Sequence, residues 1–129
     1  MEENIQLKPY ADNVGEIFDT ASLSLLTSRV EAFSLVTMES LSHGCPVISY
    51  DIKYGPSDMI KNGQNGYLIP FEEQQEFSNK IIDVLQTPSL NKSLSEQAYK
   101  LIHPFHASVT AEKWGKLLDD VSMMRKERN

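Results

Sequence analysis

Short apolar runs alternate along the chain with longer stretches in which apolar residues recur every three or four positions. The short runs indicate buried strands, whereas the three-to-four spacing indicates one apolar face of a helix. Four short strands are expected, at 5–7, 23–26, 46–50 and 66–69. Helices are expected at 12–21, 35–42, 56–61, 72–86, 89–102 and 108–124. Because strands and helices alternate, the chain is expected to adopt an α/β fold with a parallel sheet.

The loops that follow the strands, at 27–33 and 51–55, are the first places to look for a ligand, because ligands of parallel sheets bind at the carboxyl ends of strands. The first of these loops leads into a helix. The first amides of a helix have no intrahelical partner and carry partial positive charge, so a phosphate or diphosphate would fit there. The alternative is an ordinary junction that Ser34 caps with its side chain.

Two carboxylates frame the helix at 35–42. Glu31 lies in the loop before it, and Glu39 lies eight residues later, inside it. Carboxylates accept hydrogen bonds from neighbouring hydroxyl groups, as on a ribose or a hexose. Taken alone, Glu39 also fits a residue that faces solvent, and Glu31 fits a loop carboxylate near the positive end of a helix.

Composition and charge narrow the function classes. A chain of 129 residues with 40% hydrophobic and 23% charged residues is expected to form one soluble domain, over 1–129. The net charge of −6 argues against a nucleic-acid partner. The one basic cluster, at 125–128, is typical of a last helical turn and allows at most peripheral contact with a membrane. One cysteine and no secretion signal favour a cytoplasmic location.

Histidine and cysteine occur close together at His43 and Cys45, a pairing that raises the alternatives of a metal site or a nucleophile. No second ligand pair stands at the spacing of a zinc site, and Cys45 precedes a strand where small apolar residues pack. Packing roles are therefore expected for both residues. His103 and His106, before the last helix, are expected to cap it or to lie on the surface.

Three stretches together resemble the E-x7-E signature of retaining glycosyltransferases of the GT-B fold, glycosyltransferase family 4: 31–35, 38–41 and 44–48. The stretch 65–69 looks like that family's loop and strand after the donor site, and Phe105 with Trp114 looks like its final crossover region. The stretch 50–57 is similar to the branch of poly(glycerol-phosphate) α-glucosyltransferases of bacterial wall teichoic acid and of related adhesin glycosyltransferases. The resemblance implies a Rossmann-like three-layer fold.

The resemblance implies a role for each carboxylate. Glu31 would contact hydroxyl groups of the donor sugar and orient its anomeric carbon, which makes it the expected catalytic residue. Glu39 would accept hydrogen bonds from the ribose of the nucleotide. The implied donor is a nucleotide-sugar, UDP-glucose or UDP-GlcNAc, which is a substrate. Family members work without a bound divalent ion, so neither a metal nor another cofactor is expected.

The resemblance also implies that backbone amides at Phe33, Ser34 and Leu35 hold the donor diphosphate, with Ser28 in the same donor site. The family usually has glycine in place of Ala32 and Ser34, and side chains there would crowd the approach of phosphate to the backbone. An arginine and a lysine that contact the diphosphate lie earlier in the family's domain, and the chain is expected to begin after them.

The chain is therefore interpreted as the later part of a nucleotide-sugar-binding domain, without the N-terminal acceptor domain and inactive by itself. Its expected partners are the nucleotide-sugar, the missing N-terminal domain and, through an exposed sheet edge, a second copy in a homo-oligomer. The alternative is a non-catalytic α/β binding or assembly module that does not respond to nucleotide. A response-regulator-like switch would need clustered acidic residues at strand ends, where Asp51 stands alone.

Overall fold

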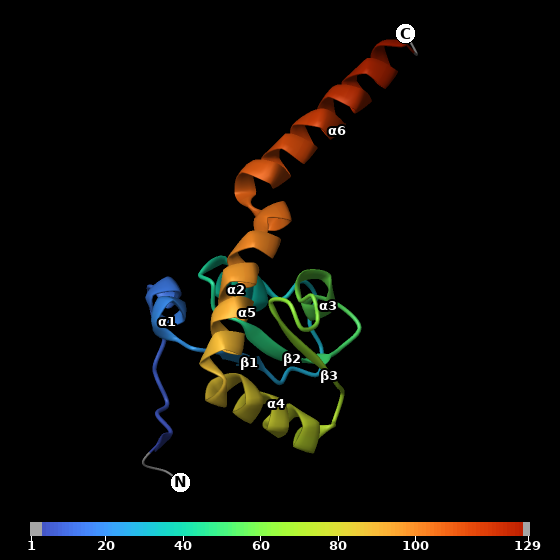
Figure 1. The fold of residues 1–129 in the computed structure, drawn as a ribbon. Coiled ribbons are helices and arrows are strands. Elements are labelled where there is room, and N and C mark those ends of the chain that lie inside the picture. Colours follow the sequence, from blue (N-terminus) through green and yellow to red (C-terminus); the bar gives the residue numbers. More distant parts are fainter. Residues whose placement is uncertain (1–3, 128–129) are drawn as a thin grey trace.

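A computed structural model describes residues 4–127 and shows strands and helices in alternation (Figure 1). The order is α1 (Val14–Thr20), β1 (Ser24–Leu26), α2 (Leu35–Ser42), β2 (Val47–Asp51), α3 (Pro56–Met59), β3 (Gly66–Pro70), α4 (Gln74–Gln86), α5 (Pro88–Leu101), the 3-10 helix η2 (His103–Phe105) and α6 (Ala107–Glu127). Each predicted helix is present. The end of α2 follows from Gly44, which takes the left-handed conformation (φ 70°) that ends helices.

The strands form a three-stranded parallel sheet in the order β1-β2-β3, as the alternation predicted. Side chains of β2 point alternately to its two faces, so that Val47 and Ile48 belong to different hydrophobic clusters. The Val47 cluster includes residues of α2, α3 and the second half of α5. The Ile48 cluster includes residues of α4 and the first half of α5. Helices therefore cover both faces, which confirms the three-layer α/β architecture.

The first residue of β3 must be a glycine. Gly66 pairs with Val47 of β2, and a Cβ atom placed on Gly66 would overlap the carbonyl oxygen of Val47. The loop before it is closed by Asn65, whose buried side chain accepts a hydrogen bond from the Lys61 amide (2.7 Å) and donates one to the Met59 carbonyl (3.0 Å). Together these residues hold β3 tightly against β2.

Two expectations from the sequence are wrong. The run 5–7 is not a strand, so the described residues form three strands and not four. Ile5 and Leu7 are 69% and 96% exposed, because no strand within residues 4–127 lies beside them to bond their backbone or cover their side chains. In addition, α4 begins at Gln74 and not at residue 72, since Glu72 has a left-handed backbone (φ 69°) that cannot be part of a helix.

Helix α6 projects from the rest of the molecule, and its main contacts are with η2 (Figure 1). Its predicted apolar stripe is present but half or more exposed: Trp114, Leu117, Leu118, Val121 and Met124. Of the helices in residues 4–127, none is both long enough and apolar enough to cross a membrane. The stripe is a surface that a partner could cover.

Candidate functional site

The start of α2 has a backbone arrangement that leaves amides free. Ser34, the residue before the helix, is buried and left-handed (φ 63°, ψ 64°). Its hydroxyl bonds to the hydroxyl of Thr37 (2.9 Å) and not to a backbone amide, so the alternative of a side-chain cap by Ser34 is wrong. Within residues 4–127, the amides of Leu35 and Val36 form no hydrogen bond. Free amides at a helix start are suited to an anion.

The residues that carry these amides line a pocket of about 430 Å³, which we call the helix-start pocket. It is lined by Glu31, Ala32, Phe33, Ser34, Leu35 and Val36. Glu31 is partly buried in its wall, and the Phe33 ring lies 6.1 Å from that of Phe105 between ring centroids. The structure thus brings four of the six predicted site residues into one pocket.

Gly55 packs against the loop formed by residues 31–34, a contact that the sequence analysis missed. It has φ 90° and ψ −83°, and a Cβ atom there would lie 3.1 Å from Ser34 Cβ, 3.2 Å from the carbonyl carbon of Phe33 and 3.3 Å from Glu31 Cβ. The β2–α3 loop therefore packs directly against the pocket. In the sequence, the Gly55-Pro56 pair at the end of the loop 51–55 could have indicated a tight turn at this position.

Replacing Gly55 with alanine is expected to displace the 31–34 loop and to cost about 1–3 kcal/mol of folding free energy, from backbone strain plus overpacking. Urea denaturation measures the cost, and amide chemical shifts of residues 31–34 report the displacement. Gly63→Ala is the matched control, because Gly63 is also left-handed (φ 77°) but a Cβ there would meet only Tyr67, at 4.0 Å. Unchanged shifts at 31–34 in Gly55→Ala would show that the loops are independent.

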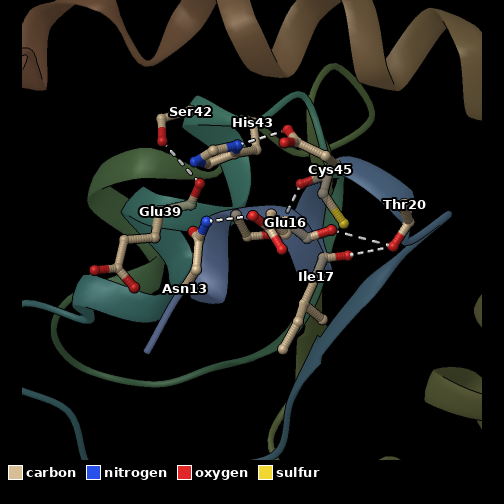
Figure 2. Close-up of polar contacts among 10 residues, drawn as sticks. Asn13, Glu16, Ile17, Thr20, Glu39, Ser42, His43 and Cys45 are labelled. Atoms are coloured by element: carbon tan, nitrogen blue, oxygen red, sulfur yellow. Dashed lines mark hydrogen bonds and ion pairs between the residues drawn. The ribbon is translucent and has the colours of Figure 1, made fainter. Parts of the chain in front are cut away.

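Glu39 lies on the flank of α2 and lines a different pocket, of about 400 Å³, which we call the helix-flank pocket. Its other lining residues are 10–15 and His43. In Figure 2 the Glu39 carboxylate turns away from the His43 ring, and it makes no hydrogen bond within the described residues. The structure therefore does not bring Glu31 and Glu39 into one pocket; it places them at two pockets along the same helix.

His43 and Cys45 have the packing roles that were predicted. His43 Nδ1 lies 2.7 Å from an Asp19 carboxylate oxygen, which ties α2 to α1 (Figure 2). The ring also lies against Gly15, where a Cβ atom would be 2.7 Å from Cε1. Cys45 is 1% exposed, and burial raises the pKa of its thiol, so the thiol stays protonated and unreactive.

The remaining candidates are spread out. Ser28 is partly buried in the β1–α2 loop and lines neither pocket, so the structure does not bring it to the other predicted site residues. His103 is exposed, and the carbonyl of His106 accepts the Thr110 amide (3.0 Å) at the start of α6, as expected for surface and capping roles. In the part of the chain that the structure describes, no three potential metal ligands gather.

A third pocket, which the sequence analysis missed, lies at the carboxyl ends of the strands. We call it the edge pocket; its volume is about 550 Å³. It is lined by Thr27, Arg29, Tyr50, Phe71, Glu72 and Gln74. These residues come from three separate segments of the chain, so no local sequence motif predicts the pocket.

The fold, with free amides at the start of α2, is that of the GT-B class of glycosyltransferases. The structure matches TarM with a TM-score of 0.83 and 30% identity, over 91% of this chain and 24% of that one. It matches the pneumococcal O-GlcNAc transferase GtfA, solved in complex with UDP and GlcNAc, with a TM-score of 0.81 and 32% identity, over 93% and 25%.

The chain belongs to the glycosyl transferases group 1 family, whose model matches residues 1–101. The poly(glycerol-phosphate) alpha-glucosyltransferase of Bacillus subtilis (strain 168) is 35% identical over 128 residues, which are 99% of this chain and 19% of that enzyme. These matches confirm the predicted GT-B glycosyltransferase resemblance, and the relatives include the poly(glycerol-phosphate) alpha-glucosyltransferase that the sequence analysis singled out. The chain spans about a fifth to a quarter of the length of these relatives.

Proposed function

We propose that the chain forms the donor-binding part of a retaining glycosyltransferase that moves a hexose from a nucleotide-sugar to a cell-wall polymer or a protein. The observation that carries the proposal is the pair of free amides at the start of α2, beside Glu31 in the helix-start pocket. The donor is UDP-glucose or UDP-GlcNAc. The match to an enzyme solved with UDP and GlcNAc supports this choice.

The donor diphosphate binds to the amides at Phe33, Ser34 and Leu35, with the free amide of Val36 next to them. Negative charge grows on the leaving diphosphate during transfer, and amides already fixed in place stabilise it without reorganising. The left-handed backbone of Ser34 is what turns its side chain inward to Thr37, so the hydroxyl does not crowd the phosphate. A serine can therefore stand where the family usually has glycine. Ala32, at the second such position, adds only a methyl group and is exposed.

The two carboxylates bind opposite ends of the donor. Glu31, in the helix-start pocket, accepts hydroxyl groups of the sugar and orients its anomeric carbon. Glu39, in the helix-flank pocket, accepts hydroxyl groups of the ribose. Their placement at two pockets along one helix supports an elongated ligand, with the diphosphate between the two ends. Ser28 belongs to the donor site only if the loop rearranges when the donor binds.

The chain by itself is proposed to be inactive, because it spans only about a fifth to a quarter of the length of its relatives and transfer needs both substrates held together. The exposed stripe of α6 supports a partner surface, and the acceptor-binding domain is the partner that we propose for it. A homo-oligomer through the sheet edge at β1 is a second proposal. The alternative function, a non-catalytic assembly module, predicts a folded chain that is indifferent to UDP.

Removing the Glu39 carboxylate is expected to weaken UDP binding by roughly tenfold, since one charge-assisted hydrogen bond of ~1.5 kcal/mol is lost. Isothermal titration of UDP into the chain and into Glu39→Ala measures this change. Glu96→Ala is the matched control, because Glu96 is also an exposed helical glutamate but lies on α5, outside the three pockets. If Glu39→Ala binds UDP as the control does, the ribose role of Glu39 is wrong. No UDP binding at all would favour the assembly module.

A further inference from the structure

We propose that Thr37 is a positioning residue for the donor diphosphate: its hydroxyl holds the Ser34 hydroxyl away from the start of α2 and so keeps the amides of Leu35 and Val36 free. The inference rests on the proposed function, because it names the residue that prepares the diphosphate site for its ligand. Thr37 lies in the first turn of α2 and lines none of the three pockets, so it acts on the ligand only through Ser34.

The hydroxyl groups of Ser34 and Thr37 are buried and depend on one another. Ser34 is 3% exposed and Thr37 is 1% exposed, and the two hydroxyl oxygens lie 2.9 Å apart. Within the described residues, neither hydroxyl has another hydrogen-bond partner. A buried hydroxyl without a partner is costly, so each of the two holds the other in place.

The backbone of Ser34 shows which arrangement this pair prevents. A serine before a helix normally has an extended backbone, and its side chain accepts a hydrogen bond from the second or third amide of the helix. Ser34 is instead left-handed (φ 63°, ψ 64°), a conformation that is costly for residues other than glycine. The Thr37 amide already donates to the Ser34 carbonyl (3.1 Å), so an ordinary cap would take the Val36 amide. Ordinary capping and diphosphate binding therefore compete for the same amide.

The β2–α3 loop buries Ser34 without directing its hydroxyl. A Cβ atom on Gly55 would lie 3.1 Å from Ser34 Cβ, so the backbone of this loop passes close to the serine. In the part of the chain that the structure describes, the loop offers the Ser34 hydroxyl no hydrogen bond. Thr37 supplies the partner that decides where the hydroxyl points.

The consequence for the donor is a site that is ready before the ligand arrives. Amides that are already free stabilise the diphosphate without first breaking a hydrogen bond to the protein. If the Thr37 hydroxyl is lost, the Ser34 hydroxyl caps the Val36 amide, and the diphosphate must displace it. Thr37 therefore raises the affinity for the donor without contacting it.

Isothermal titration of UDP into the chain and its variants tests the proposal. Thr37→Val keeps the shape of the side chain and removes its hydroxyl, and we expect UDP affinity to fall by about tenfold, as for the loss of one hydrogen bond to a charged group. Thr37→Ser keeps the hydroxyl and should restore binding. Ser40→Ala is the matched control, because it also removes a buried hydroxyl from α2, but one that donates to the Cys45 carbonyl (2.9 Å). It should lower stability in urea and leave UDP affinity unchanged.

Adding Ser34→Gly to Thr37→Val separates positioning from a general disturbance of the helix. Glycine adopts the left-handed backbone without strain and has no hydroxyl with which to cap the helix. The double variant should therefore recover most of the affinity that Thr37→Val loses. Nuclear magnetic resonance gives a second readout without UDP, because the carbon chemical shifts of Ser34 in Thr37→Val should move towards those of an extended backbone.

Two results would overturn the proposal and leave the proposed function standing: a Thr37→Val variant that binds UDP as tightly as the unmodified chain, or a double variant that binds no more tightly than Thr37→Val. If Thr37→Val fails to fold by circular dichroism, the unmodified chain decides, since extended carbon shifts at Ser34 before UDP is added would contradict the proposal. An unmodified chain that binds no UDP would count against the proposed function and, with it, against the positioning role.

Discussion

Replacing Glu31 with alanine is expected to lower the kcat of the proposed sugar transfer on the order of 100-fold, the loss that follows when a reacting group is misplaced by about 1 Å. The donor KM changes little, because the sugar contact strengthens only as the transition state forms. Glu31 stands in the wall of the helix-start pocket beside the free amides, so its loss affects the sugar while the diphosphate stays bound. Folding survives, since Glu31 is not among the core residues.

The assay needs a complete enzyme. A chimaera in which this chain replaces the matching segment of the Bacillus subtilis relative supplies one, since 99% of this chain is covered by the match. Steady-state kinetics of the chimaera and its Glu31→Ala variant give the split between kcat and KM, and the isolated chain serves as the inactive control. Glu39→Ala in the same chimaera should raise donor KM and spare kcat. If Glu31→Ala changes only KM, the proposed role of Glu31 in the chemical step is wrong.

Replacing Gly66 with alanine is expected to unfold most of the chain. The added methyl group would overlap the Val47 carbonyl oxygen, and the obstacle is backbone that cannot turn aside as a side chain can. The strands must separate, which breaks the pairing of β2 with β3 and loosens both hydrophobic clusters. The expected loss is roughly 3 kcal/mol or more, a large part of the stability of a small domain. Urea denaturation followed by circular dichroism measures it.

Gly115→Ala is the matched control for the same substitution. Gly115 lies inside α6, and apart from the backbone of that helix and the two neighbouring residues no atom lies within 4 Å of an added Cβ. Alanine there removes the helix cost of glycine, so stability should stay equal or rise by up to about 1 kcal/mol. If Gly66→Ala and Gly115→Ala unfold at the same urea concentration, the close approach of β3 to β2 at Gly66 is wrong.

The fold was largely predictable because local patterns determine it. The β-branched run at 46–50 and the apolar run at 66–69 became neighbouring parallel strands, and the amphipathic stretches became the helices on either face. The run 5–7 has the same apolar character, but a strand also needs a partner beside it. Pattern alone cannot supply that information, because the partner is a property of the whole sheet.

The site was predictable only in part, and the missing part is three-dimensional. The free amides of α2 and the place of Glu31 follow from a helix that starts after a strand. A serine before a helix normally caps it, so the sequence did not predict the left-handed backbone of Ser34 or the close packing of Gly55 against this loop. The edge pocket joins three loops that are far apart in sequence, so only the sheet reveals it.

The central claim is that α2 holds a nucleoside diphosphate, with phosphates at its start and ribose at its flank. Amide chemical-shift mapping of the chain with UDP tests this claim most directly, since it observes backbone amides along the chain in one experiment. We expect saturable shifts at Phe33, Ser34 and Leu35 together with shifts around Glu39, and none along α6. Saturable shifts that avoid the start of α2, or an unchanged spectrum at high UDP concentration, would contradict it.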